Sequence, residues 1–293
     1  MLDIKDIKEN ESLRLHTTYK VGGLAKYFIS PKSIDELIKL VKYLKENNIK
    51  YMILGNGSNT IFSSKTYAGV IINLNKINNM KIDGNKIYVE AGYQLIKLSI
   101  DAMNNNLSGL EFASGIPANV GGAIFMNAGA YKSDMSEVIE DVTFLDEDLN
   151  IKTLTKEELN FSYRHSLFQE KDYIIISANL VLNNGNKEEI KELMDNRKQR
   201  RIESQPLEYP SAGSVFRNPA EDIYAGKLIE DLGLKGYSIG DAKISEKHAN
   251  FIINTGNATG EDIKALIDLV KDKVKEKYNI DLIVEQRFVN FGD

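Results

Sequence analysis

Cysteine is absent from this 293-residue chain and histidine occurs only three times, which removes several common kinds of site at once. Without thiols there is no disulfide, no thiolate nucleophile, no thiolate-bound zinc and no cysteine-held iron–sulfur cluster. The histidines (His16, His165 and His248) are scattered and show no H-E-x-x-H spacing. The sequence therefore predicts no metal site.

Long apolar runs and long basic runs are missing as well. No stretch approaches the roughly 20 apolar residues that span a bilayer. Residues 1–6 mix acids with bases and lack the apolar core of a signal peptide. The net charge of −5, without a basic tract, argues against nucleic acid as a partner. We therefore expect a cytoplasmic protein that acts neither on a membrane nor on nucleic acid.

What remains is the composition of a globular protein, with 42% hydrophobic and 27% charged residues. The length suggests about two domains or three small ones. Capping residues at 33–36 and at 259–262 each predict the start of a helix, the second of them a long one. Apolar periodicity predicts three further helices, at 94–105, 188–202 and 225–232. Strands are predicted at 25–29, 51–54, 70–74, 87–91, 138–146, 173–182, 249–253 and 280–284. A boundary at 183–186 and a separate α+β domain after it are expected.

The strand at 51–54 ends directly in Gly55, Asn56, Gly57, Ser58 and Asn59. This order is close to a dinucleotide-binding turn, but the third glycine of G-x-G-x-x-G is missing, and the next residues look like loop or strand instead of helix. Successive small residues after a strand can still present backbone amides to a phosphate. We expect phosphate binding here, with a plain turn as the alternative.

Small residues are densest at 109–130. Such a segment fits where the backbone lies against a large flat ligand. A glycine-rich linker is the alternative, and the interleaved Ile, Val, Phe and Met residues, which need burial, argue against it. We therefore expect this segment to form a ligand wall.

A third segment, residues 211–219, places Ser214 among small and aromatic neighbours, with Arg217 and Asn218 directly after it. Small residues let the backbone approach a ligand, and an Arg with an Asn offers a cation and an amide to an anionic one. The same residue types are the usual ones of a surface turn, which is the alternative.

Charged side chains elsewhere have roles that their local sequence leaves open. Arg164 lies among aromatic residues and could stack on one of them or present its guanidinium to a carboxylate. Arg197 and Arg201 continue the apolar stripe of the helix at 188–202, so they either extend into solvent or reach an anionic ligand. Glu285 follows an apolar run; burial would raise the pKa of its carboxyl group, and a neighbouring cation would lower it.

Taken in order, these motifs resemble the UDP-N-acetylenolpyruvoylglucosamine reductase (MurB) family of peptidoglycan synthesis. The matching segments cover nearly the whole chain and lie at 17–25, 54–59, 109–131, 163–168, 205–219, 225–254 and 285–288. The interval from Arg164 to the helix at 188 has no room for the extra tyrosine-bearing loop of the family's first type, so the chain resembles the second type.

The resemblance implies a fold and a cofactor. The fold is α+β, with an FAD-binding fold of the vanillyl-alcohol-oxidase (PCMH) type in two subdomains, 1–75 and 76–186. A C-terminal α+β substrate-binding domain, 187–293, follows, and its last residues are expected to pack back on the FAD-binding domain. The FAD pyrophosphate would lie on Gly55, Asn56, Gly57, Ser58 and Asn59. The flavin would be lined by Gly115, Ile116, Pro117, Gly121, Gly122 and Ala123.

The resemblance also implies an activity, the NADPH-dependent reduction of UDP-N-acetylglucosamine enolpyruvate to UDP-N-acetylmuramate. Ser214 matches the family's proton donor, and Arg164 and Glu285 match its other two catalytic positions. The nucleotide-sugar substrate would meet Arg201, Arg217 and Asn218. The chain departs from the family's pattern at Asn56, Lys132, Asp241 and Gln286.

Two other functions remain open. A second FAD-dependent oxidoreductase of the same fold would be reduced by an alcohol without NADPH, and a non-catalytic nucleotide-sugar or flavin-binding protein would bind its ligand without turnover. The sequence does not give the oligomeric state, for which we favour a monomer.

Overall fold

The computed structural model describes residues 7–292, which form two compact units. The first unit contains Tyr27–Asn56 and Gly69–Gln199 with residues 7–8; the second contains Glu9–Lys26, Gly57–Ala68 and residues 200–292. Both units are therefore discontinuous along the chain. The three-part division at 1–75, 76–186 and 187–293 stays a prediction.

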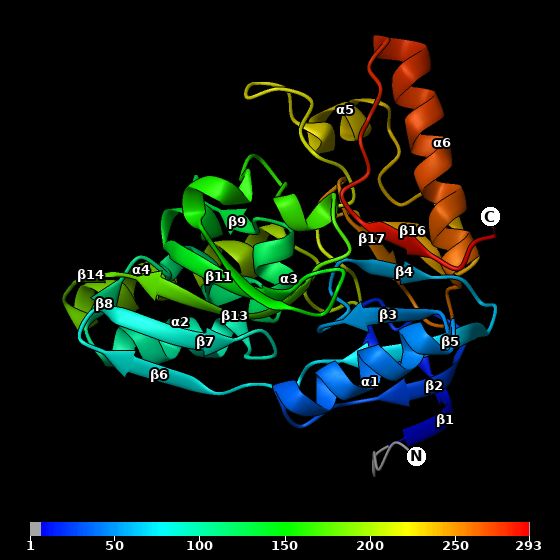
Figure 1. The fold of residues 1–293 in the computed structure, drawn as a ribbon. Coiled ribbons are helices and arrows are strands. Elements are labelled where there is room, and N and C mark those ends of the chain that lie inside the picture. The colour runs from blue at the N-terminus through cyan, green and yellow to red at the C-terminus, as the bar shows by residue number, and fades with distance from the viewer. Residues whose placement is uncertain (1–6, 293) are drawn as a thin grey trace. The chain divides into compact units, whose positions relative to one another are not determined.

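The first unit is built on an antiparallel five-stranded sheet in the order β12-β11-β13-β7-β6 (Figure 1). Its strands are β6 (Met80–Asp83), β7 (Lys86–Glu90), β11 (Ile139–Leu145), β12 (Ile151–Thr155) and β13 (Ile174–Val181). The central strand β13 is almost entirely buried, as its continuous apolar run predicts. The short helix α3 (Val120–Phe125) packs on β7 and β13, and α2 (Leu95–Asn104) lies beside the 3-10 helix η2 (Glu111–Gly115).

A second sheet has the order β1-β2-β5-β3, and the chain passes between the units within β1, β2 and β5. Its strands are β1 (Ile7–Ser12), β2 (Leu24–Ile29), β3 (Tyr51–Leu54) and β5 (Tyr67–Asn73), of which β3 and β5 are parallel. The connection before β3 contains α1 (Ile34–Glu46), which buries four apolar residues at helical spacing. The Oγ of Ser33 accepts from the N–H of Glu36 at 3.2 Å, so the predicted cap is present, although the Glu36 carboxylate accepts from the N–H of Lys32 instead of Ser33.

The second unit combines a small antiparallel sheet with two helices (Figure 1). The sheet is β15 (Ser238–Ile239), β16 (Ala242–Ile244) and β17 (Ile252–Asn254), and the helices are α5 (Ala225–Asp231) and α6 (Gly260–Tyr278). The predicted cap of α6 is a complete capping box, because Thr259 Oγ1 and the Asp262 carboxylate each accept from the other's N–H, at 3.0 and 2.9 Å. A parallel pair, β4 (Thr60–Phe62) with β18 (Arg287–Val289), joins segments far apart in sequence.

The remaining elements are short, apart from α4 (Lys187–Ser204). Two-stranded pairs are β8 (Leu107–Ser108) with β14 (Asn183–Asn184) and β9 (Gly129–Ala130) with β10 (Ser133–Asp134). Further 3-10 helices are η1 (Leu13–His16), η3 (Met135–Glu137), η4 (Lys156–Leu159) and η5 (Leu167–Gln169).

Three sequence-based expectations need correction. The strand expected at 280–284 is wrong: Val284 forms a single bridge to Phe216, and the strand lies later, at Arg287–Val289. The strand expected at 249–253 lies at Ile252–Asn254. The apolar stripe expected along α4 is shorter than predicted, because Leu193 is 42% exposed.

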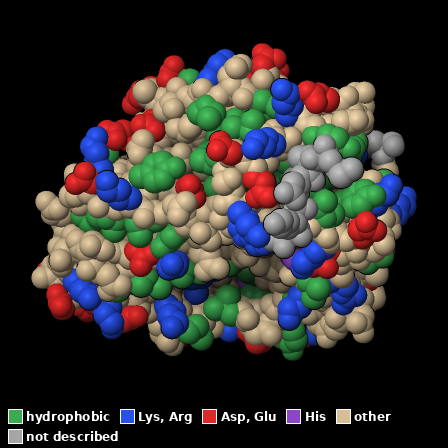
Figure 2. Space-filling model, turned by 60° about the horizontal axis from the view of Figure 1, so that its bottom comes forward, with side chains coloured by type: hydrophobic (Ala, Val, Ile, Leu, Met, Phe, Trp, Pro, Cys, Tyr) green, Lys and Arg blue, Asp and Glu red, His purple; other side chains and the backbone are tan. Residues whose placement is uncertain are grey.

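The surface carries mixed charge on the face shown in Figure 2, where Lys and Arg side chains are interspersed with Asp and Glu among the described residues. Such a face exerts little long-range attraction on a polyanion, and the absence of a nucleic-acid partner stays a prediction. Among residues 7–292, no helix combines the length and the apolar run that crossing a bilayer requires.

Candidate active site

The first half of the glycine turn, Gly55 and Asn56, and the small-residue segment at 115–123 lie together in the first unit. Asn56 donates from Nδ2 to the carbonyl of Pro117 at 2.6 Å, across 61 residues of sequence. Asn73 donates from Nδ2 to the carbonyl of Gly55 at 2.9 Å. A Cβ atom added at Gly55 would lie 3.1 Å from Asn119 Oδ1. Two segments that the sequence singled out separately therefore form one neighbourhood, in which Asn56 and Pro117 are exposed.

Asn119 marks this neighbourhood as a place for a ligand. Its side chain is buried and donates from Nδ2 to the carbonyl of Gly92 at 2.6 Å. Its Oδ1, which faces Gly55, has no hydrogen-bond donor in the part of the chain that the structure describes. A buried oxygen left without a donor costs about 1–3 kcal/mol. A hydroxyl or N–H of a flavin nucleotide would remove that cost, so the residues present fit such a cofactor.

The glycines of α3 differ in what surrounds them. A Cβ at Gly121 would lie 2.9 Å from the Cβ of Ala91, so Gly121 allows close packing inside the first unit. A Cβ at Gly122 would meet nothing within 4 Å, and this residue is exposed. Ala123 is completely buried in the core, so its side chain packs inside the unit, and its predicted place in the lining of the flavin stays a prediction. Ile116 is also packed against that core, whereas Gly122 is an open position of α3.

The second half of the glycine turn belongs to the second unit. Gly57 has a φ of +62°, and a Cβ there would lie 2.1 Å from the carbonyl oxygen of His16, so only glycine fits. The carbonyl of Gly57 accepts from the N–H of Thr18 at 3.3 Å. The Oγ1 of Thr18 is buried and has no hydrogen-bond partner among the described residues. This second orphaned oxygen beside the turn also fits a polar ligand.

Ser214 and Glu285 lie on two hydrogen-bonded segments of the second unit. The N–H of Glu285 donates to the carbonyl of Val215 at 2.8 Å, and the N–H of Arg217 donates to the carbonyl of Ile283 at 2.9 Å. Asn59 belongs to the same network, because its Nδ2 donates to the carbonyl of Glu285 at 3.1 Å. Three candidate residues from three distant segments are therefore neighbours, and Ser214 itself is partly exposed.

Asn250, which the sequence did not single out, holds the residues that follow Ser214. Its Oδ1 accepts from the N–H of Phe216 at 3.0 Å, and its Nδ2 donates to the carbonyl of the same residue at 2.9 Å. Its own carbonyl accepts from the N–H of Val215 at 2.9 Å. A buried amide that pairs with both the N–H and the C=O of one residue fixes the backbone there.

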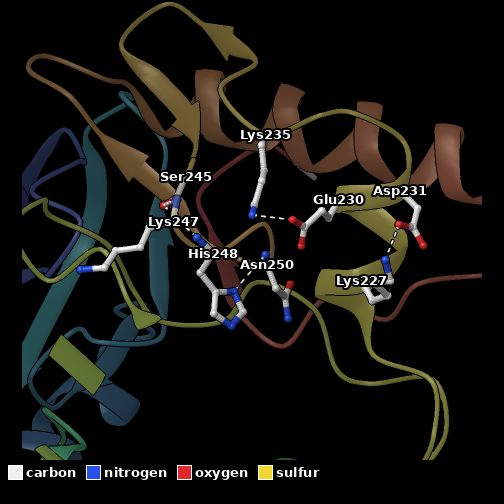
Figure 3. Close-up of polar contacts among 8 residues, drawn as sticks. All are labelled: Lys227, Glu230, Asp231, Lys235, Ser245, Lys247, His248 and Asn250. Carbon is white, nitrogen blue, oxygen red and sulfur yellow. Dashed lines mark hydrogen bonds and ion pairs between the residues drawn. The ribbon is translucent and has the colours of Figure 1, made fainter. Parts of the chain in front are cut away.

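His248 supports Asn250 in turn (Figure 3). Its Nδ1 accepts from the N–H of Asn250 at 3.2 Å, and Ser245 Oγ accepts from the N–H groups of Lys247 and His248 at 3.1 and 3.3 Å. Burial lowers the pKa of His248. The ring is therefore held neutral, which is the state in which Nδ1 can accept.

The same view shows two lysines, Lys227 within α5 and Lys235 after its end (Figure 3). Lys227 pairs with Asp231 at 2.6 Å, and Lys235 pairs with Glu230 at 2.7 Å. Exposed pairs of this kind add little stability, so exchanging their carboxylates for a ligand's phosphates would cost the fold little.

The residues expected to meet the substrate lie in the second unit. Asn218 Oδ1 accepts from the N–H of Ala225, the first residue of α5, at 3.2 Å, so this oxygen positions the helix. Arg217 and Arg201 are half-buried, the former in the segment after Ser214 and the latter in the last turn of α4. Arg197, by contrast, lies in the first unit, with its guanidinium carbon 4.8 Å from the centre of the Tyr131 ring.

Arg164 stands in the first unit in a tight turn closed by Ser162 and His165. Its guanidinium stacks on Tyr163 at 5.0 Å, and its Nη2 donates to the carbonyl of Gly129 at 2.7 Å. Its φ is +57°, a conformation that costs a non-glycine residue about 1–2 kcal/mol. A strained backbone beneath a held cation is typical of a functional position.

Comparison with known proteins places this arrangement in a family. The family model described as "FAD binding domain" matches residues 25–155, and the one described as "UDP-N-acetylenolpyruvoylglucosamine reductase, C-terminal domain" matches residues 205–289. A UDP-N-acetylenolpyruvoylglucosamine reductase of Caldanaerobacter subterraneus subsp. tengcongensis is 51% identical over 96% of this chain and 92% of its own length. One of Clostridium novyi is 46% identical over 99% of this chain and 94% of its own length.

A solved structure agrees with these relatives. The crystal structure of UDP-N-acetylenolpyruvylglucosamine reductase (MurB) from Thermus caldophilus superposes with a TM-score of 0.82 at 33% identity, covering 97% of this chain and 98% of that one. The predicted α+β class, with an FAD-binding fold followed by a C-terminal domain, is confirmed.

Proposed function

The chain belongs to the UDP-N-acetylenolpyruvoylglucosamine reductase family, and from that premise we propose that it reduces UDP-N-acetylglucosamine enolpyruvate to UDP-N-acetylmuramate in peptidoglycan synthesis, with FAD as cofactor and NADPH as reductant. The observation that carries the proposal is the backbone pairing of the segments that hold Ser214 and Glu285, in which the N–H of Glu285 donates to the carbonyl of Val215 at 2.8 Å. We also propose that the enzyme works in the cytoplasm as a monomer.

FAD, when bound, supplies the hydride that it receives from NADPH and passes to the vinyl carbon of the substrate. The residues that would hold it are Gly55, Asn56, Gly57, Ser58 and Asn59 of the glycine turn and Gly115, Ile116, Pro117 and Gly122 of the small-residue segment. The two orphaned oxygens, Asn119 Oδ1 and Thr18 Oγ1, and the open face of Gly122 support this assignment.

Ser214 supplies the proton that completes the reduction. Addition of hydride to one carbon of the double bond moves the π electron pair toward the other carbon and its carboxylate. The O–H proton of Ser214 forms the new C–H bond at that second carbon, and the resulting alkoxide regains a proton from water. A hydroxyl is a weak acid, but an enolate-like carbon is basic enough to take its proton.

Arg164 and Glu285 stabilise the charge that precedes this transfer. The guanidinium of Arg164 pairs with the substrate carboxylate, where negative charge collects. The carboxyl group of Glu285, either protonated or hydrogen-bonded to the substrate, helps to stabilise the enolate-like intermediate. The diphosphate of the nucleotide sugar meets Arg201, Arg217 and Asn218, with Lys227 and Lys235 close to the start and end of α5.

The test separates the two halves of the reaction. The purified protein should hold FAD, and NADPH should reduce it. Mixing the reduced protein with UDP-N-acetylglucosamine enolpyruvate should then reoxidise the flavin. Ser214→Ala should slow that second step by about 10²–10⁴-fold and leave the first unchanged, while the neighbouring Ser211→Ala should affect neither.

Three results would count against the proposal. Full-rate reoxidation in Ser214→Ala would remove the proton-donor role. Flavin reduction by an alcohol without NADPH would favour another oxidoreductase of this fold. Tight binding of the nucleotide sugar without any turnover would favour a carrier.

A further inference from the structure

The side chain of Gln286 lies inside the second unit, 4% exposed, directly after the proposed catalytic residue Glu285. Its Nε2 donates to the carbonyl of Ala212 at 3.1 Å, and the carbonyls of Gly213 and Ser214 lie 3.4 Å from the same nitrogen. One amide group thus faces three successive carbonyls of the segment that carries Ser214, across 72 residues of sequence.

Tyr19 fixes the direction of this amide. Its hydroxyl donates to Gln286 Oε1 at 3.0 Å, so Oε1 faces Tyr19 and Nε2 must face the carbonyls. Tyr19 is fully buried, and burial raises the pKa of its hydroxyl, which therefore remains a donor at any pH where the enzyme works. The backbone of Tyr19 is held as well, because its carbonyl accepts from Asn254 Nδ2 at 3.0 Å.

The segment before Ser214 needs such a support. Gly213 has a φ of +74°, and a Cβ there would meet nothing within 4 Å, so neither a side chain nor close packing restricts this residue. Asn250 holds the backbone only from Val215 onward. Gln286 supplies the contacts to the carbonyls of residues 212–214. The backbone is therefore held on both sides of Ser214 by a buried carboxamide, that of Gln286 before it and that of Asn250 after it.

We propose that Gln286 is a positioning residue of the reaction: its amide holds the backbone of Ala212–Gly213–Ser214 so that Ser214 Oγ is aimed at the carbon to be protonated. This inference rests on the proposed function. Gln286 touches neither substrate nor cofactor in this role and acts only through the Ser214 segment. Displacing a reacting group by about 1 Å can slow a step about 10²-fold, so the loss of one such support should be visible in the rate.

The first experiment compares two buried amides of the second unit. Gln286→Leu should slow the reoxidation of reduced flavin by UDP-N-acetylglucosamine enolpyruvate about 10- to 10²-fold and change the reduction of flavin by NADPH less than about twofold. The matched control is Asn254→Leu: Asn254 is 2% exposed, and its side chain bonds only backbone groups, the carbonyl of Tyr19 and the N–H groups of Gly256 and Ala258, and bonds neither the Tyr19 hydroxyl nor the Ser214 segment. Asn254→Leu should lower the thermal midpoint of unfolding at least as much as Gln286→Leu does. It should leave unchanged the ratio of the rate of flavin reduction by NADPH to the rate of flavin reoxidation by the enolpyruvyl substrate.

The second experiment asks whether Gln286 acts through Ser214. In the Ser214→Ala background, Gln286→Leu should slow the substrate step no further, because the group that it positions is gone. Tyr19→Phe keeps the Gln286 amide but removes what fixes its direction, so it should slow the same step by a smaller factor. Equal slowing of both half-reactions, or an undiminished effect in the Ser214→Ala background, would overturn the inference.

A readout without turnover separates this inference from the proposed function. Gln286→Leu should speed hydrogen–deuterium exchange of the amides at 211–217 in the complete protein, whereas Asn254→Leu should not. Unchanged exchange in that segment would refute the support by Gln286 whatever the enzyme's activity. A wild-type protein that fails to reduce the enolpyruvyl substrate would refute the proposed function instead.

Discussion

The two adjacent glycines of α3 give opposite expectations for the same substitution. At Gly122, a Cβ would meet no atom within 4 Å, and the residue lies in a helix with ordinary φ. Alanine is favoured over glycine in a helix by about 0.5–1 kcal/mol. Gly122→Ala should therefore stabilise the protein stripped of FAD, by up to about 1–4 °C in its thermal midpoint.

The same methyl group should weaken cofactor binding. If the open face of Gly122 lies against FAD, the added carbon occupies space that the cofactor needs, and misfits of one methyl group cost about 1–3 kcal/mol. The dissociation constant for FAD should then rise about 5- to 150-fold. A variant that is more stable without its cofactor and yet holds it less tightly is hard to explain by general damage to the fold.

The assay is a titration of flavin-free protein with FAD, followed by the quenching of flavin fluorescence, next to thermal unfolding of the same samples. Gly121→Ala is the control, since its Cβ would lie 2.9 Å from that of Ala91 and should destabilise the flavin-free protein by about 1–3 kcal/mol. Wild-type FAD affinity in Gly122→Ala would show that this face of α3 does not meet the cofactor.

Three further outcomes are expected. Burial lowers the pKa of His248, so the folded protein keeps it neutral while the unfolded chain takes up a proton near pH 6.5; stability should be full above that pH and fall below it, and His248→Gln should flatten this acid-side fall in urea midpoints. Gly57→Ala should destabilise the protein by about 2 kcal/mol or more, because of its positive φ and the carbonyl of His16, measured as a lower urea midpoint. Arg164→Lys should raise the KM for the enolpyruvyl substrate about 10-fold or more, since a lysine offers no bidentate pair, with the KM for NADPH unchanged as the check.

Helices could be predicted from the sequence because their signals are local. The capping residues Thr259 and Asp262 stand three positions apart, and the apolar residues from Ile263 to Val274 follow the period of a helix. The structure has α6 with these residues buried, as expected. The same reasoning gave α1, where only the partner of the Glu36 carboxylate differs.

Strand pairing could not be predicted in the same way, because the alternation of apolar and polar residues within a strand does not identify the strand with which it pairs. Residues 280–284 carry the β-branched and apolar residues typical of a strand, yet only Val284 forms a bridge. The hydrogen-bonded strand is Arg287–Val289, because these are the residues that lie alongside their partner strand β4. A pattern of period two indicates a strand but does not fix its register.

The candidate site was predictable as a set of residue types but not as a set of roles. Gly121 and Gly122 are indistinguishable in sequence, and only their surroundings separate a packing position from an open one. Gln286 stood out only as a departure from the family's pattern, and nothing local shows that it reaches back to Ala212. Asn250 is another case of a polar residue whose partner is set by tertiary structure.

The pairing of β4 with β18 has a consequence for how the chain acquires its structure during synthesis. Asn59 of the β4 segment bonds both Glu285 and Arg287. Glu285 follows Asn59 by 226 residues, so the ribosome must add about that many residues before these bonds can form. At about 5–20 residues per second, β4 waits roughly 10 to 45 s for its partner. During that time its buried apolar residues and unpaired edge are available to other chains. Aggregation in the cell should therefore respond to translation speed between these two strands more than to speed elsewhere.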